Sequence, residues 1–249
     1  MKFNLKVIGT GSAFTKKQSH TSLLIEVNDK KYLFDCGFKV PQALHDMGIS
    51  LEEIDGIIIS HIHGDHTGGL EEVGFMGKYV LNKKFDLFIA EELLSPLWDN
   101  TLSGGMYELG NNEYGSLEMF FNVHSFKDLQ SFKINKLEIL PIRTVHVNKQ
   151  KPSYSFFIDE RVFFSADSLL DRELINQLYD DGCKTFFHDC QLFDSPHPVH
   201  ASITELIDLP EEIKSKTFAL HYGDNYENYE NIFKENKITR ANQGDIFQF

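Results

Sequence analysis

The strongest constraint on the fold is an apolar run that ends in a cluster of polar residues. Residues 56–60 read GIIIS, and the stretch that begins at the last of them, 60–69, reads SHIHGDHTGG. A short continuous apolar run is typical of a strand that is buried on both faces, as in sheets covered by helices. Functional sites collect at the carboxyl ends of such strands. The sequence therefore predicts an α/β architecture with a site directly after this strand.

The polar cluster places three imidazoles and one carboxylate within six positions. His61 and His63 are two apart, so both can turn toward one point, whereas Asp65 and His66 follow the bend at Gly64 and face a neighbouring point. Imidazole nitrogen suits zinc, and a carboxylate oxygen can bridge two ions. Because this grouping serves neither helix nor strand propensity, we predict a site for two metal ions.

Three distant residues share the position of His61 at the end of an apolar strand. They are His146 after ILPIRTV, Asp167 after VFFSA and His221 after TFAL. A histidine at a strand end is usually a satisfied polar side chain, so each residue alone gives a weak signal. Together with the cluster they become candidates to complete the two metal sites.

The rest of the chain predicts strands alternating with helices. We expect strands at 3–8, 22–27, 32–35, 85–90, 131–134, 137–142, 153–158, 161–166, 185–188 and 217–220, and helices at 40–47, 67–82, 91–100, 171–178, 202–209 and 227–234. Residues 101–122 are rich in glycine and aromatic side chains without a regular period, which favours a long loop or cap. No linker-like or repeated segment interrupts the sequence, so we expect one domain over residues 1–249.

Charge and composition limit the partners. The chain has 24 Lys and Arg against 37 Asp and Glu, a formal net charge of -13. This charge disfavours a long nucleic-acid interface, because such binding depends on neutralising phosphates. The three cysteines lack CxxC spacing, which indicates reduced thiols in a cytosol. No run approaches the roughly 20 apolar residues of a membrane span, so we expect a cytoplasmic protein.

The six residues HIHGDH match the HxHxDH signature of the metallo-β-lactamase superfamily, and the distant candidates follow in that family's order. The resemblance implies an αββα sandwich of two mixed sheets flanked by helices, with two Zn²⁺ ions, or Mn²⁺ in their place, at one edge. It assigns one ion to His61, His63 and His146, the other to Asp65, His66 and His221, and the bridge to Asp167. It also counts Asp65 among the catalytic residues.

Segments near the start of the chain narrow this resemblance. VIGTGSAF, SHTSLL and LFDCG resemble the beginning of tRNase Z and its phosphodiesterase relatives. The resemblance implies that Asp35 orders the metal-binding loop and that Ser12 contacts the substrate.

Two later segments resemble catalytic motifs of the same branch. HDCQ and HPVHAS are similar to degenerate forms of the tRNase Z motifs HEAT and HST. By this resemblance, Asp189 supports His200, and His200 protonates the leaving oxygen. His188 and His197 stay open as alternative proton donors, because both motifs depart from the family pattern. His197 and Ser202 are also expected substrate contacts.

The spacing of the ligands bears on the substrate. In tRNase Z a long arm that grips tRNA is inserted between the ligands equivalent to His146 and Asp167, but here only 21 positions separate them. A small phosphodiester fits better. Over its whole length the chain resembles the compact phage and bacterial phosphodiesterases of anti-Pycsar defence evasion. The resemblance implies hydrolysis of 3′,5′-cyclic nucleotides (cAMP, cGMP, cCMP and cUMP) to nucleoside monophosphates, in the host cytosol if the protein is phage-encoded.

The aromatic segment is the expected source of base contacts. Tyr107 and Tyr114 offer stacking surfaces that tolerate different bases. In related enzymes a loop of one subunit lies over the other subunit's site, so the resemblance implies a homodimer. The base preference and the physiological metal stay open. The alternatives are a tRNA 3′-processing endonuclease and a thioester or lactone hydrolase, which needs no phosphate-directed histidine.

Overall fold

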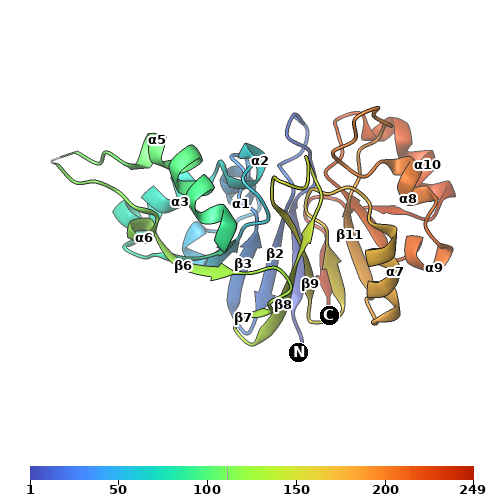
Figure 1. Ribbon diagram of the computed structural model, residues 1–249, viewed down its shortest axis with the longest axis horizontal. Coiled ribbons are helices and arrows are strands. Elements are labelled where there is room, and N and C mark those ends of the chain that lie inside the picture. Colours follow the sequence, from blue (N-terminus) through green and yellow to red (C-terminus); the bar gives the residue numbers. More distant parts are fainter. Residues whose placement is uncertain (111) are drawn as a thin grey trace.

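Two mixed β-sheets lie face to face at the centre of the computed structural model, which describes residues 1–110 and 112–249 (Figure 1). The first sheet contains β1 (Asn4–Gly9), β2 (Ser22–Val27), β3 (Lys30–Phe34), β4 (Gly56–Ile58), β5 (Phe85–Ala90), β6 (Phe121–Phe126) and β14 (Ile246–Gln248). The second contains β7 (Phe132–Ile134), β8 (Leu137–Thr144), β9 (Ser153–Ile158), β10 (Val162–Phe164), β11 (Thr185–Asp189), β12 (Thr217–Leu220) and β13 (Thr239–Arg240).

Each sheet combines an antiparallel and a parallel part. The first has the order β14-β1-β2-β3-β4-β5-β6, antiparallel from β14 to β3 and parallel from β3 to β6. The second has the order β13-β12-β11-β10-β9-β8-β7, parallel from β13 to β10 and antiparallel beyond. The predicted sandwich of two mixed sheets is confirmed.

Helices cover the outer face of each sheet (Figure 1). Beside the first sheet are α1 (Val40–Asp46), η1 (Leu51–Glu53), α2 (Gly64–Thr67), α3 (Leu70–Met76), η2 (Gly77–Leu81), η3 (Glu91–Leu93), α4 (Leu94–Leu97), η4 (Trp98–Leu102), α5 (Ser103–Met106) and α6 (Leu117–Phe120). Beside the second are α7 (Arg172–Asp180), α8 (Ile203–Ile207), α9 (Glu211–Lys214), η5 (Tyr226–Tyr229) and α10 (Glu230–Glu235). In the described ranges, no helix combines the length and apolar character needed to cross a bilayer.

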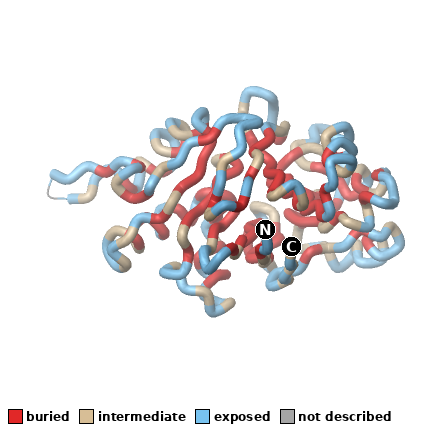
Figure 2. Tube along the Cα trace, turned by 90° about the horizontal axis from the view of Figure 1, so that it is seen from below, coloured by how far each residue is buried: buried red, intermediate tan, exposed pale blue. Residues whose placement is uncertain are grey.

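Aromatic side chains join the two sheets. Phe34 at the end of β3 packs against Phe156 of β9 and Phe164 of β10, with ring centroids 5.0 and 5.4 Å apart. Figure 2 shows buried residues concentrated at the centre of the molecule and exposed residues mainly at its periphery. The apolar strand β4 lies within this core and pairs in parallel with β3 and β5, which explains its continuous run of isoleucine. The sheets therefore hold the end of β4 rigidly at one edge of the sandwich.

Several predicted elements need correction. The expected helix over 67–82 is interrupted at Gly69, whose N–H donates to Cys36 O at 2.8 Å, because the chain passes close to the end of β3 there. The expected loop at 101–122 was wrong in three places: η4 and α5 occupy its start up to Met106, α6 occupies Leu117–Phe120, and β6 starts at Phe121. As an edge strand with several exposed side chains, β6 lacks the alternation by which strands are recognised. Residue 111 of this expected loop lies outside the described residues.

Candidate metal-dependent active site

Four strand ends converge at the edge of the sandwich where α2 lies (Figure 1). The HxHxDH residues follow β4, with His63 at the N-cap of α2, and the other candidates follow β8, β10 and β12. The structure brings all seven predicted ligands together: His61, His63, Asp65, His66, His146, Asp167 and His221.

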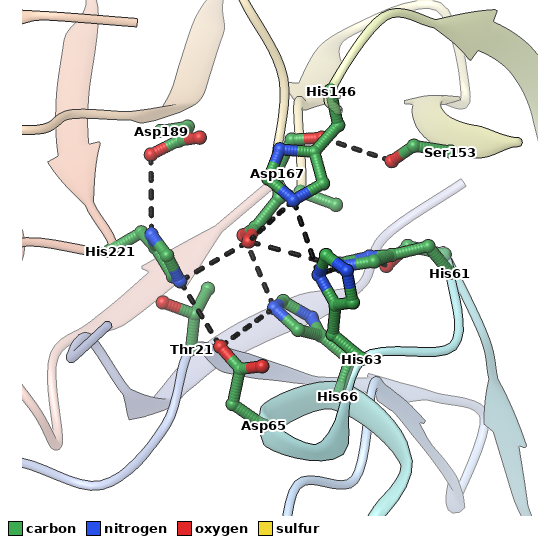
Figure 3. Close-up of polar contacts among 12 residues, drawn as sticks. Thr21, His61, His63, Asp65, His66, His146, Ser153, Asp167, Asp189 and His221 are labelled. Carbon is green, nitrogen blue, oxygen red and sulfur yellow. Dashed lines mark hydrogen bonds and ion pairs between the residues drawn. The ribbon is translucent and has the colours of Figure 1, made fainter. Parts of the chain in front are cut away.

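Asp167 lies between two groups of side chains (Figure 3). Its Oδ2 is 3.9 Å from His61 Nε2, 3.8 Å from His146 Nε2 and 3.3 Å from His221 Nε2. Its Oδ1 is 3.2 Å from His66 Nε2. In the described ranges, three groups of side chains have their donor atoms within 4.8 Å of one another and could each hold an ion. They are His61, His63, His146 and Asp167; Asp65, His66, Asp167 and His221; and Asp167, Asp189, His200 and His221.

The donor atoms fit divalent cations. His66 Nε2 and Asp167 Oδ1 are buried and have no hydrogen-bond partner in the described ranges, although they face each other. Buried polar atoms are normally paired, so two unpaired buried atoms that face each other are suited to bind a cation. Imidazole nitrogen with carboxylate oxygen is the set that suits zinc and similar ions.

The pKa values of the candidate ligands bear on metal binding. Burial and the charge of His66 hold the pKa of His61 well below its usual value, and burial with the Lys151 ammonium lowers the pKa of His63 to about 4. Although burial opposes it, His66 and His221 keep the pKa of Asp65 below its usual range. At neutral pH these two imidazoles are thus neutral and the carboxylate is ionised, which are the forms that bind metal. Although burial opposes it, Asp167 raises the pKa of His66 and raises that of His221 to about 10, so metal binding at these two residues must displace a proton.

Asp35 orders the loop from behind. Its carboxylate accepts hydrogen bonds from Ser60 N at 2.8 Å, Ser60 Oγ at 2.6 Å and His66 Nδ1 at 2.7 Å. Because Nδ1 of His66 donates to Asp35, Nε2 is left facing Asp167. A carboxylate behind a ligating imidazole fixes its tautomer and ring orientation. This is the geometry expected of a residue that orders the metal-binding loop.

A third group of side chains adjoins the cluster. Asp189 Oδ2 accepts a hydrogen bond from His200 Nδ1 at 2.6 Å and from Ser168 N at 3.1 Å. Its other oxygen lies 3.4 Å from His221 Nδ1. The His200 ring packs against His146 and His221, with ring centroids 4.7 Å apart in both cases. His200 therefore lies beside the metal cluster, and Asp189 contacts both His200 and a candidate ligand.

The other predicted site residues lie in different surroundings. His188 is buried against Phe163 and its Nδ1 pairs with a backbone carbonyl, while His197 is exposed. The Ser202 hydroxyl caps α8 by accepting from Glu205 N. Neither His188 nor His197 is in a group with the candidate ligands in the part of the chain that the structure describes.

Ser12 and the two tyrosines also differ in their positions. Ser12 lines a small cavity together with His200 and His221. Tyr107 and Tyr114 are exposed and pack on each other, with ring centroids 5.2 Å apart. Their segment extends away from the sheets at the α5 end of the molecule (Figures 1 and 2). The two tyrosines thus do not join the metal cluster of their own chain.

One residue of the site was not predicted. Lys151 Nζ lies 2.7 Å from His63 Nε2, so His63 presents its other nitrogen, Nδ1, to His61 and His146. Lys151 follows β8 in the polar segment NKQK and is not part of any motif, so the sequence carries no signal for it.

Comparison with known proteins identifies the family. The family model described as anti-Pycsar protein Apyc1 matches residues 3–247. The chain belongs to the Apyc1 family. It is 44% identical over 230 residues to the anti-Pycsar protein Apyc1 of Paenibacillus harenae, covering 91% of this chain and 92% of that protein. It is 40% identical over 257 residues to the Apyc1 of Bacillus phage vB_BveM-Goe7, covering 96% of both.

The fold of this Apyc1-family chain is also found among solved structures. It is similar to the metallo-beta-lactamase fold protein YhfI from Bacillus subtilis, with a TM-score of 0.79, 19% identity and coverage of 100% of this chain and 99% of that one. The predicted resemblance to the anti-Pycsar branch of the superfamily is confirmed. Family, fold and the His/Asp clusters together support a metal-dependent hydrolase.

Proposed function

We propose that this Apyc1-family member is a dinuclear zinc phosphodiesterase that hydrolyses 3′,5′-cyclic nucleotides to nucleoside monophosphates and so removes the signal of a cyclic-nucleotide defence in the host cytosol. The family supports the biological role. The group of His61, His63, His146 and Asp167 and the group of Asp65, His66, Asp167 and His221 support two ions, with Mn²⁺ as the alternative to Zn²⁺. Bound divalent cations supply activation of water and neutralisation of phosphoryl charge.

The observation that carries the proposal is the pair His200 and Asp189. Because His200 Nδ1 donates to Asp189, its Nε2 is the nitrogen that can hold a transferable proton. A ribose oxygen is a poor leaving group and needs that proton, whereas a thioester or an activated phenol does not. Asp189 stabilises the protonated imidazole, so His200 acts as the general acid and Asp189 as the residue that positions it.

The proposal favours a small substrate over tRNA. The interval from His146 to Asp167 contains β9 and β10, which pair with each other in the second sheet. It leaves no length for an inserted arm. The net charge of -13 also opposes the binding of a polyanion.

The test compares two substrates that differ in their leaving group. With cAMP, cGMP, cCMP and cUMP we expect nucleoside monophosphates from wild-type protein, and we expect His200→Ala to lower kcat for cAMP by about 10²–10⁴-fold. With bis-p-nitrophenyl phosphate, whose leaving group needs no proton, the same variant keeps most of its activity. Equal losses on both substrates would refute the general-acid role. Cleavage of a 3′-extended tRNA alone, or of thioesters and lactones alone, would refute the phosphodiesterase assignment.

The matched control is His45→Ala. His45 is an exposed histidine of α1 and belongs to no group of candidate ligands in the described ranges, so its loss should leave both activities unchanged. Asp189→Asn keeps the shape of the side chain but not its charge, and should lower kcat for cAMP by about 10–100-fold.

The proposal includes a homodimer in which Tyr107 and Tyr114 of one subunit reach the substrate in the partner's site. Their exposure and their distance from the sheets of their own chain support it. A mixing experiment tests it: Tyr107→Ala/Tyr114→Ala supplies an intact metal site, and Asp167→Ala supplies intact tyrosines. If the segment crosses, an equal mixture of the two weak variants regains about a quarter of the wild-type sites through mixed dimers. A monomeric mass by light scattering, or no recovery on mixing, would refute it.

A further inference from the structure

Two exposed phenylalanines stand on the rim of a cavity beside the metal cluster. The cavity has a volume of about 180 Å³, and His200 and His221 line it together with Ser12 and Asn225. Phe14 and Phe193 also line it, and they are 88% and 59% exposed. They come from different parts of the fold, Phe14 from the loop between β1 and β2 and Phe193 from the loop after β11.

The loop that carries Phe14 is fixed in place. Asp224 accepts hydrogen bonds from Lys16 N at 2.8 Å, from Lys17 N at 2.9 Å and from the Thr15 hydroxyl. Since Asp224 follows His221 by three positions, these bonds tie the Phe14 turn to the loop of a candidate ligand. The ring is thus held at the surface by its backbone, without burial of its own.

The loop that carries Phe193 is fixed in a similar way. Gln191 Nε2 donates to Phe193 O at 2.7 Å, and Thr204 Oγ1 donates to the side chain of the next residue, Asp194, at 3.2 Å. Gln191 N donates to Ala201 O at 2.7 Å, directly beside His200. Both aromatic rings are therefore presented by loops that also carry residues of the active site.

We propose that Phe14 and Phe193 form the nucleobase subsite, so that the base of a cyclic nucleotide stacks on these rings while its phosphate lies at the metal cluster. This inference rests on the proposed function. Aromatic rings can stack on any nucleobase, because every base has a π-face, so stacking does not select one base. Because the backbones of both loops are fixed before binding, only the side-chain rotations of the two rings remain to be ordered when the ligand arrives. The subsite thus predicts an enzyme that accepts several bases and prefers purines, which have the larger stacking area.

The first experiment separates base binding from chemistry. Steady-state kinetics are measured for Phe14→Ala, Phe193→Ala and the double variant with cAMP and with methyl riboside 3′,5′-cyclic phosphate, which has the reacting group but no base. We expect each single variant to raise KM for cAMP about tenfold, with kcat within about twofold of wild type. Kinetics with the compound that lacks a base should not change, and Phe14→Trp should restore a low KM for cAMP.

The matched control is Tyr79→Ala. Tyr79 is an exposed aromatic residue of η2, with an exposed fraction of 57% close to that of Phe193, and it does not line this cavity. This variant should behave as wild type with both substrates. An unchanged KM for cAMP in the double variant, or equal losses with and without a base, would overturn the subsite.

A binding measurement separates this inference from the proposed function. Calorimetry compares AMP with ribose 5-phosphate, which lacks the base, on wild-type protein and on the double variant. Tighter binding of AMP that the double variant loses would support the subsite even if the wild type hydrolysed no cyclic nucleotide, a result that would refute the proposed function alone. Equal affinity of wild-type protein for AMP and ribose 5-phosphate would overturn the subsite even if cAMP were hydrolysed.

Discussion

Asp35 controls the metal-binding loop although it is not a candidate ligand. Its backbone has a φ of 59°, a conformation that asparagine tolerates, so Asp35→Asn keeps the fold but replaces one acceptor of the Ser60 and His66 hydrogen bonds by an amide donor. We expect this variant to fold and to bind metal about 10–100-fold more weakly, measured by competition with a chromophoric chelator. Asp29→Asn, at an exposed position with φ 62°, is the control and should bind as wild type. Equal affinities in both variants would contradict this role.

His20 gives a pH dependence to stability. It is buried against the edge of Phe38, and neither ring nitrogen has a hydrogen-bond partner within the described ranges. Burial lowers the pKa of His20 to about 4, so between pH 6.5 and 4 the unfolded chain binds a proton that the folded chain does not. The stability that His20 contributes is therefore present above pH 6.5 and is lost as the pH falls.

The expected loss between pH 7 and pH 5 is about 2 kcal/mol for His20 alone. Urea unfolding of the chelator-treated protein at both pH values, compared with His20→Gln, measures it. The wild type should lose about 2 kcal/mol more than the variant over this interval. Parallel losses in the two proteins would show that the His20 ring takes up its proton in the folded state as well.

At the scale of elements, the start of α2 depends on the loop after β3. Cys36 N donates to His66 O at 2.7 Å, and Gly69 N donates to Cys36 O at 2.8 Å. A Cβ on Gly37 would lie 1.9 Å from Asp65 O, whereas one on Gly64 would meet no atom within 4 Å. The contact at Gly37 is with backbone, which cannot rotate away.

Two glycine variants test this contact. Gly37→Ala must push the metal-binding loop outward, and we expect it to lose about 3 kcal/mol of stability and most of its bound metal. Gly64→Ala lies inside the HxHxDH motif itself but should keep both. Thermal unfolding measures the stability of the two purified variants, and elemental analysis measures their bound metal. A loss of metal in Gly64→Ala with retention in Gly37→Ala would show that the loop requires glycine at residue 64 and not at residue 37.

The elements that the sequence predicts well are those with a strong local pattern. The isoleucines of β4 and the capping residues of α8 mark their own elements, and Ser202 and Glu205 form the expected reciprocal hydrogen bonds. The edge strands β6, β13 and β14 were missed because a short edge strand has little periodicity and is defined by its partner. The strand β14 pairs with β1, and no local sequence pattern predicts this pairing.

The residues of the candidate site were likewise predicted best where they form a local sequence pattern. The HxHxDH residues stand together in the sequence and could be interpreted directly. His146, Asp167 and His221 each had only the weak signal of a position at the end of an apolar strand, which the order of a known family then strengthened. Lys151 and Phe193 belong to no motif, and Phe14 ends the segment VIGTGSAF, which gave no signal for its own role; only the folded loops bring the three residues to the edge of the cluster.

At the scale of the whole molecule, the metal sites connect the two sheets. His61, His63, Asp65 and His66 extend from the first sheet, and the other three candidates extend from the second. Ions that bind only the folded state stabilise it by about 2.7 kcal/mol at a free concentration 100 times Kd. For a chain of this size, chelation should then lower Tm by roughly 5–10 °C, measured by calorimetry. An unchanged Tm, with the loss of metal verified by elemental analysis, would show that the sheets do not depend on the ions.

The pairing of β14 with β1 also determines how late in translation the molecule can complete its fold. At about 5–20 residues per second, a ribosome adds His221 roughly 10–30 s after His61. Until then the nascent chain carries an incomplete set of ligands, and β1 is an open edge until Ile246–Gln248 arrive. The set of candidate ligands can therefore be complete only after nearly all of the residues have been translated, so any activity of this site is delayed by the full time of synthesis.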